Sequence, residues 1–93
     1  MKTRFLVVVE KGESNYSAYS PDLPGCIATG KTIEETLDEM RSAVEFHLEG
    51  MIENNDPLPV PRSLSTYILD TDEISVDDIL TSIEAEVPQL AAA

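Results

Sequence analysis

The chain has 93 residues and a formal net charge of −12, which comes from 18 acids and only 6 lysines and arginines. Its length allows one domain and leaves no room for a second independent core. Its charge repels phosphate backbones, so direct binding of DNA or RNA by this chain is not expected. The basic residues form no cluster that could offset this repulsion; they are Lys2, Arg4, Lys11, Lys31, Arg41 and Arg62.

Nothing in the chain resembles a membrane span or a secretory signal. The apolar run of residues 5–9 is too short for either. The single cysteine, Cys26, excludes an internal disulfide. We therefore expect a cytoplasmic protein with no membrane partner.

Three strands are predicted before the first long helical pattern. Residues 5–9 are apolar and rich in β-branched side chains, which is typical of a buried strand. A polar turn at 11–15 leads to a half-exposed strand at 16–20, so these segments form a hairpin. Pro24 and Gly25 fit a type II turn, in which the glycine adopts a positive φ. Residues 26–29 are then the third strand.

The helix is the clearest element of the sequence. Thr32 and Glu35 form a capping box, and the chain should leave the helix at Asn54 and Asn55, just before Pro57. Residues 65–69 are predicted as a fourth strand. The helix presents one apolar stripe, made of Ile33, Leu37, Met40, Val44, Leu48 and Met51.

The last part of the chain is acidic. Residues 71–93 hold no lysine or arginine. Ser75 can cap a short helix whose apolar face is made of Val76, Ile79, Leu80 and Ile83. We predict a division into residues 1–70 and an acidic tail of residues 71–93. The expected fold is α+β: a small antiparallel β-sheet with one long helix in the order β-β-β-α-β, and a short C-terminal helix.

The sequence offers little for catalysis. Cys26 and His47 could form a nucleophile and base, but no third orienting group and no oxyanion loop accompany them. Spaced metal ligands and a glycine-rich phosphate loop are also missing. We therefore expect no enzyme, no metal and no cofactor.

A row of like charges lies along the second half of the predicted helix. Glu45, Glu49 and Glu53 are spaced four residues apart, which costs about 0.2–0.5 kcal/mol per pair. A solvated face kept soluble by charge would explain them equally well. The acidic tail repeats the pattern, which favours a surface for a basic partner. The predicted partner-binding residues are Glu45, Glu49, Glu53, Asp77 and Asp78, together with Phe46, an aromatic side chain off the apolar stripe.

Several motifs resemble the HicB antitoxin domain over residues 3–69. They are Tyr16 and Tyr19, the Pro-Asp-Leu-Pro-Gly-Cys run at 21–26, Gly-Lys-Thr at 30–32, the pair Glu34 and Glu35, and the prolines at 59 and 61. The resemblance implies a partial, catalytically inactive RNase H-like fold. It also implies a homodimer or larger oligomer that neutralises a HicA toxin, a small basic ribonuclease that cleaves mRNA, by covering its active site.

The sequence departs from many members of that family at its C-terminal end. Those members carry a DNA-binding domain there, whereas residues 71–93 have no base to contact phosphate. A second hypothesis therefore stays open, in which the chain is a solitary homo-oligomeric module that binds a different protein or a small ligand.

Overall fold

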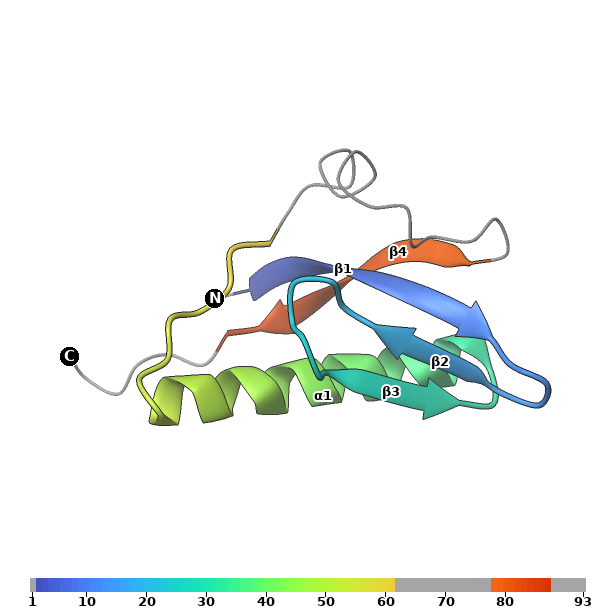
Figure 1. Cartoon of the computed structure of the whole chain (residues 1–93), viewed down its shortest axis with the longest axis horizontal. Helices are drawn as coiled ribbons and strands as arrows, with labels where there is room; N and C mark the ends of the chain where they lie inside the picture. Colours follow the sequence, from blue (N-terminus) through green and yellow to red (C-terminus); the bar gives the residue numbers. More distant parts are fainter. Residues whose placement is uncertain (1, 62–77, 88–93) are drawn as a thin grey trace.

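The computed structural model describes residues 2–61 and 78–87, in which one long helix covers one face of a four-stranded sheet (Figure 1). The elements are β1 (Lys2–Lys11), β2 (Tyr16–Tyr19), β3 (Ile27–Gly30), α1 (Ile33–Glu53) and β4 (Ile79–Glu86). All neighbouring strands are antiparallel, in the order β3-β2-β1-β4. The predicted α+β class, with a small antiparallel sheet and one long helix, is confirmed.

The central strand β1 explains the continuous apolar run of the sequence. Residues 5–9 are all buried, because alternate side chains of this strand enter two different clusters. Phe5, Val7 and Val9 belong to the main core between sheet and helix. Val8 packs on the opposite face of the sheet beside Tyr19. A strand between two neighbours, covered on both faces, requires apolar residues at every position.

The loop between β2 and β3 turns where the sequence predicts. Gly25 has a φ of +84°, a backbone conformation that residues with a Cβ rarely adopt. Next to it the amide of Cys26 donates to the carbonyl of Leu23 over 3.1 Å. Leu23 is only 1% exposed, so it anchors this loop in the core.

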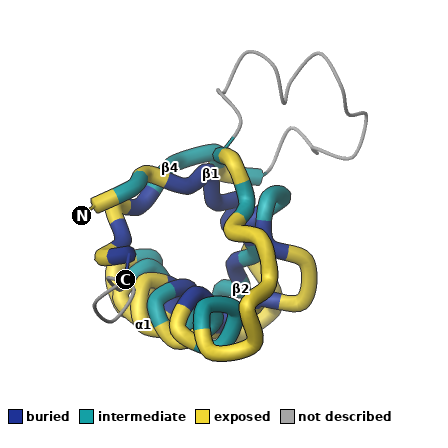
Figure 2. Tube along the Cα trace, turned by 90° about the vertical axis from the view of Figure 1, so that its left-hand side faces the viewer, coloured by how far each residue is buried: buried dark blue, intermediate teal, exposed yellow. Residues whose placement is uncertain are grey.

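The helix begins with the predicted cap. The hydroxyl of Thr32 accepts the amide hydrogen of Glu35 at 3.0 Å. Thr36 is buried, and its hydroxyl donates to the carbonyl of Thr32 at 2.7 Å, which satisfies the polar group inside the core. Figure 2 shows the buried residues of helix and sheet facing each other. The fully buried side chains of α1 recur every four residues, at Thr36, Met40, Val44 and Leu48.

The helix ends in a Schellman motif. Asn55 has a φ of 59°, in the left-handed region that asparagine tolerates better than most residues. Its amide donates to the carbonyl of Ile52 over 3.1 Å, and the amide of Asp56 donates to that of Met51 over 2.8 Å. The predicted stop at Asn54 and Asn55 is confirmed.

The prediction of a short C-terminal helix is wrong for residues 79–86. Ile79, Leu80 and Ile83 lie in β4, which pairs along β1 from Ile79 beside Val9 to Glu86 beside Lys2. Helical spacing of these apolar residues is misleading because the core selects a different set. Ile83, Ala85 and Val87 are buried at alternate positions, and the intervening Glu84 and Glu86 are exposed.

Two predictions lie outside the described residues. The strand predicted at 65–69 and the division predicted between residues 70 and 71 both fall within 62–77. The order β-β-β-α-β holds for the described part of the chain, with 79–86 as the final strand.

Candidate partner-binding surface

The three acids of the predicted row of like charges on α1 differ in their exposure and contacts. Glu49 and Glu53 are exposed. Glu45 is half-buried, and its Oε2 accepts the backbone amide hydrogen of Glu86 at 2.7 Å. Glu45 therefore holds the end of β4 against the helix. Because its carboxylate already accepts this hydrogen bond, it is less available to a partner than the exposed acids.

Arg41, like Glu45, is a residue of α1 whose side chain contacts β4. Its Nε donates to the carbonyl of Glu84 over 3.2 Å, and its guanidinium also pairs with Asp38 at 3.2 Å. Among the described strands β4 lies at an edge of the sheet, so its outward backbone groups have no neighbouring strand there. The two helix side chains satisfy one donor and one acceptor of that edge.

The outer side of the helix carries a hollow near its C-terminal end. Phe46 stands at its margin and is 77% exposed, the second-highest exposure among the large apolar side chains described. The hollow has a volume of about 370 Å³. Apart from the neighbouring backbone of its own helix, a Cβ built on Gly50 would meet no atom within 4 Å, so this glycine leaves space at the floor of the hollow. The lining residues are Phe46, His47, Gly50, Met51, Asn54 and Asp56.

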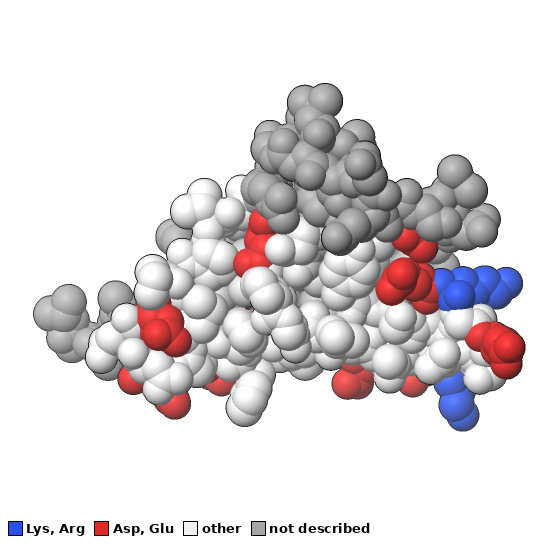
Figure 3. Space-filling view, in the orientation of Figure 1, with Lys and Arg blue, Asp and Glu red and all other residues white. Residues whose placement is uncertain are grey.

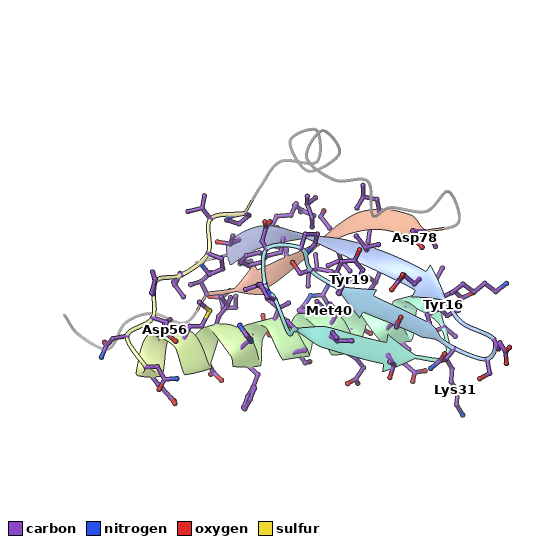
Figure 4. The ribbon with its side chains drawn as sticks, in the orientation of Figure 1. Tyr16, Tyr19, Lys31, Met40, Asp56 and Asp78 are labelled. Carbon is purple, nitrogen blue, oxygen red and sulfur yellow. The ribbon has the colours of Figure 1, made fainter. Side chains whose placement is uncertain are left out.

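Charge is unevenly distributed around this hollow. Asp56 lies at the end of α1, whereas Lys31 lies at the opposite end of the molecule (Figure 4). On the face shown in Figure 3, the lysine and arginine atoms gather at the end with the β1–β2 turn, and acidic atoms extend to the other end. The last turn of the helix contains no base. Within the described residues, no base is paired with Glu49 or Glu53.

The structure separates Asp78 from this surface. Asp78 directly precedes β4, at the end that lies beside Val9, and Glu45 contacts the opposite end of that strand at Glu86. Those ends are about 23 Å apart for a strand of this length. Figure 4 likewise shows Asp78 and Asp56 at opposite ends. Asp77 lies outside the described residues.

Cys26, which the sequence analysis weighed as a nucleophile and set aside, is deeply buried. Cys26 is 4% exposed, and burial raises the pKa of its thiol because desolvation disfavours the thiolate. A raised pKa keeps the thiol protonated at neutral pH, which is opposite to the need of a nucleophilic cysteine. His47, its proposed partner, lines the hollow on the helix.

Neither a metal cluster nor a membrane helix is found in the part of the chain that the structure describes. Across residues 2–61 and 78–87, no three histidine, cysteine or acidic side chains gather as metal ligands. No helix in these ranges combines the length and hydropathy needed to cross a bilayer.

A second cavity, which the sequence analysis missed, lies at the open end of the core. It has a volume of about 290 Å³ and is formed where the proline-rich segment after α1 crosses β1. No local pattern in the sequence relates the prolines of this segment to Phe5. The lining is almost entirely apolar, and comprises Thr3, Phe5, Leu48, Leu58, Pro59, Val60, Pro61 and Val87.

Comparison with known proteins identifies the class of this fold. An N-terminal domain of the Burkholderia pseudomallei antitoxin HicB superposes with a TM-score of 0.74 at 24% identity, covering 87% of this chain and 95% of that domain. A chain of the HicA3 and HicB3 toxin–antitoxin complex gives a TM-score of 0.76 at 24% identity, covering 90% of this chain and 99% of that one. The fold is that of HicB antitoxins.

Sequence comparison assigns the family. The family model described as "HicB_like antitoxin of bacterial toxin-antitoxin system" matches residues 5–91. A 14.9 kDa protein from the rep-hol intergenic region of Haemophilus phage HP1 is 31% identical over 84 residues. That match covers 90% of this chain and 62% of the phage protein. The chain belongs to the HicB-like antitoxin family.

Proposed function

We propose that the chain is an antitoxin that binds a small basic HicA-type toxin and covers the site with which the toxin cleaves mRNA. The family match over residues 5–91 carries this proposal. Two structures with the same fold support it, because both are toxin–antitoxin complexes, one of them from Streptococcus pneumoniae. This role is not enzymatic, and it places the protein in the cytoplasm, where mRNA is translated.

The acidic outer face of α1 is the proposed contact surface. Glu49 and Glu53 project into solvent beside the exposed ring of Phe46, so a basic partner gains attraction there without breaking a contact within the chain. Glu45 contributes less, because its carboxylate already accepts a hydrogen bond from β4. Asp77 and Asp78 stay in the proposal as a second acidic contact, separate from the helix.

Capture followed by an RNA cleavage assay tests this function. The tagged chain is expressed in its own host, and co-purifying proteins are identified by mass spectrometry. We expect a basic protein of fewer than about 100 residues, because charge complementarity selects such a partner. The partner alone should cleave an mRNA, and one equivalent of this chain should stop the cleavage.

Two results would contradict the proposal. One is undiminished cleavage in the presence of excess chain. The other is Mg²⁺-dependent cleavage by this chain alone, which would make it an enzyme.

The apolar cavity at the end of the core favours a second candidate. A largely apolar lining with few polar groups is typical of small-ligand sites, so a solitary homo-oligomeric module that binds a small apolar molecule fits this feature. Recovery of the chain only with copies of itself and a bound small molecule would favour this alternative.

A further inference from the structure

The hollow at the C-terminal end of α1 combines three properties that together select one kind of side chain. Its margin is the exposed ring of Phe46, its floor is open above Gly50, and Asp56 lies in its wall. An exposed aromatic face attracts cations, arginine more often than lysine. A carboxylate at the wall adds a hydrogen-bond acceptor for a guanidinium group.

The helix itself adds to the negative potential at this place. Its C-terminal end carries a partial negative charge, and no base of its own lies in the last turn. Two bases outside the hollow pair with other acids: Arg41 pairs with Asp38, and Arg4 pairs with Glu84, each at 3.2 Å. In the described ranges, the hollow is lined by no lysine or arginine.

We propose that this hollow receives an arginine side chain of a basic protein partner, with the guanidinium stacked on Phe46 and its N–H groups directed at Asp56. A guanidinium is more weakly hydrated than an ammonium, so it loses less when it enters a largely apolar hollow. The inference rests on the proposed function for the identity of the partner only, since the stacking face and the carboxylate belong to this chain.

A second copy of the chain is a poorer occupant. Each copy carries a net charge of −12, so two acidic helix ends would repel each other on approach. The surface therefore suits a partner of opposite charge.

Amide chemical shifts of the full chain test the hollow without any toxin. The ¹⁵N-labelled protein is titrated with argininamide and, separately, with lysinamide at equal ionic strength. We expect saturable shifts at Gly50, Asn54 and Asp56, with argininamide the tighter ligand. Phe46→Ala should weaken argininamide binding about fivefold, which is the loss of one cation–π contact.

A matched variant separates the hollow from general electrostatics. Ile27 is 64% exposed on β3, so Ile27→Ala removes a comparable apolar side chain elsewhere and should leave the titration unchanged. Equal binding of the two amides, or an unchanged affinity in Phe46→Ala, would overturn the inference. A salt-dependent dimer that Phe46→Ala dissolves would also overturn it, in favour of a second copy.

The captured partner distinguishes this inference from the proposed function. If the partner binds wild-type chain and Phe46→Ala equally well, the arginine site is wrong and the antitoxin role stands. If no basic partner is captured while argininamide binds as expected, the antitoxin role fails and the hollow remains an arginine-selective site for another protein.

Discussion

At the scale of single residues, Glu45 and Glu49 look alike in the sequence but differ in the structure. Glu45 accepts the amide hydrogen of Glu86 at 2.7 Å, and Glu49 is exposed one turn later. The spacing of four residues predicts a common helix face, but it does not reveal which carboxylate meets a strand from the far end of the chain. That contact depends on β4, which the sequence analysis assigned to a helix.

Removal of the Glu45 carboxylate should destabilise the fold. Glu45→Ala leaves the Glu86 amide without its charged acceptor, which costs about 1–2 kcal/mol for a partly exposed group. Glu49→Ala serves as the control and should change the free energy of unfolding by less than about 0.5 kcal/mol, because it removes only like-charge repulsion. Urea denaturation of both variants measures the difference, and equal values would show that the Glu45 contact contributes nothing.

The buried thiol of Cys26 makes stability depend on pH in the alkaline range. Its pKa is raised above the ordinary value of 9.0, so the unfolded chain loses this proton before the folded chain does. The contribution is therefore complete below about pH 9 and is lost as the pH rises through the folded pKa. Unfolding free energies of wild type and Cys26→Ala, measured between about pH 8 and pH 11, should diverge in slope. Parallel curves would contradict a buried thiol.

At the scale of elements, the local signals of α1 were sufficient and those of β4 were not. The capping residue Thr32, the four-residue apolar repeat and the terminal asparagines act within the helix, so sequence alone located both of its ends. β4 is stabilised by pairing with β1, whose paired residues lie 70 or more positions earlier in the chain. Ile83, Ala85 and Val87 alternate as in a strand and are buried. The sequence also places Ile83 at helical spacing from Ile79, and this second pattern led to the wrong prediction.

The burial of Ile83 allows a direct test that residues 79–86 form a strand of the core and not a helix. Ile83 is 2% exposed and lies opposite Phe5 on β1. Ile83→Ala should lower the free energy of unfolding by about 2–4 kcal/mol, as for other buried isoleucines. Thr81→Ala, at a half-buried position of the same strand, is the control. A loss below about 1 kcal/mol at Ile83 would argue that this residue does not reach the core.

Two glycines should respond in opposite ways to the same substitution. A Cβ on Gly30 would lie 2.7 Å from the backbone nitrogen of Thr36, so Gly30→Ala should destabilise the contact of β3 with α1 by about 1–3 kcal/mol. Gly50 lies inside α1 with open space around it, and Gly50→Ala should stabilise the helix by about 0.5–1 kcal/mol. Thermal unfolding of both variants checks the signs, and two changes of the same sign would contradict the packing described.

At the scale of the whole molecule, the acidic charge and the exposed side chains of the helix support the proposed binding of a basic partner. The sequence predicted an acidic domain with a basic partner, and the structure places exposed acids and an exposed aromatic ring on the outer side of α1. The sequence did not reveal the hollow, because its shape depends on how the chain turns after Asn55. Asp78 remains a predicted contact of its own, because the antiparallel pairing of β4 carries it to the other end of the sheet from Glu86.

The affinity between this chain and its captured basic partner, measured at two salt concentrations, tests the central claim most directly. Between about 0.05 M and 0.5 M NaCl the screening length falls severalfold, so the dissociation constant should rise by about tenfold or more if exposed acids attract the partner. A chain carrying Glu49→Lys and Glu53→Lys should bind more weakly at low salt and lose most of this salt dependence. Equal affinity at both concentrations, with no effect of the two reversals, would contradict an antitoxin that binds through its acidic helix.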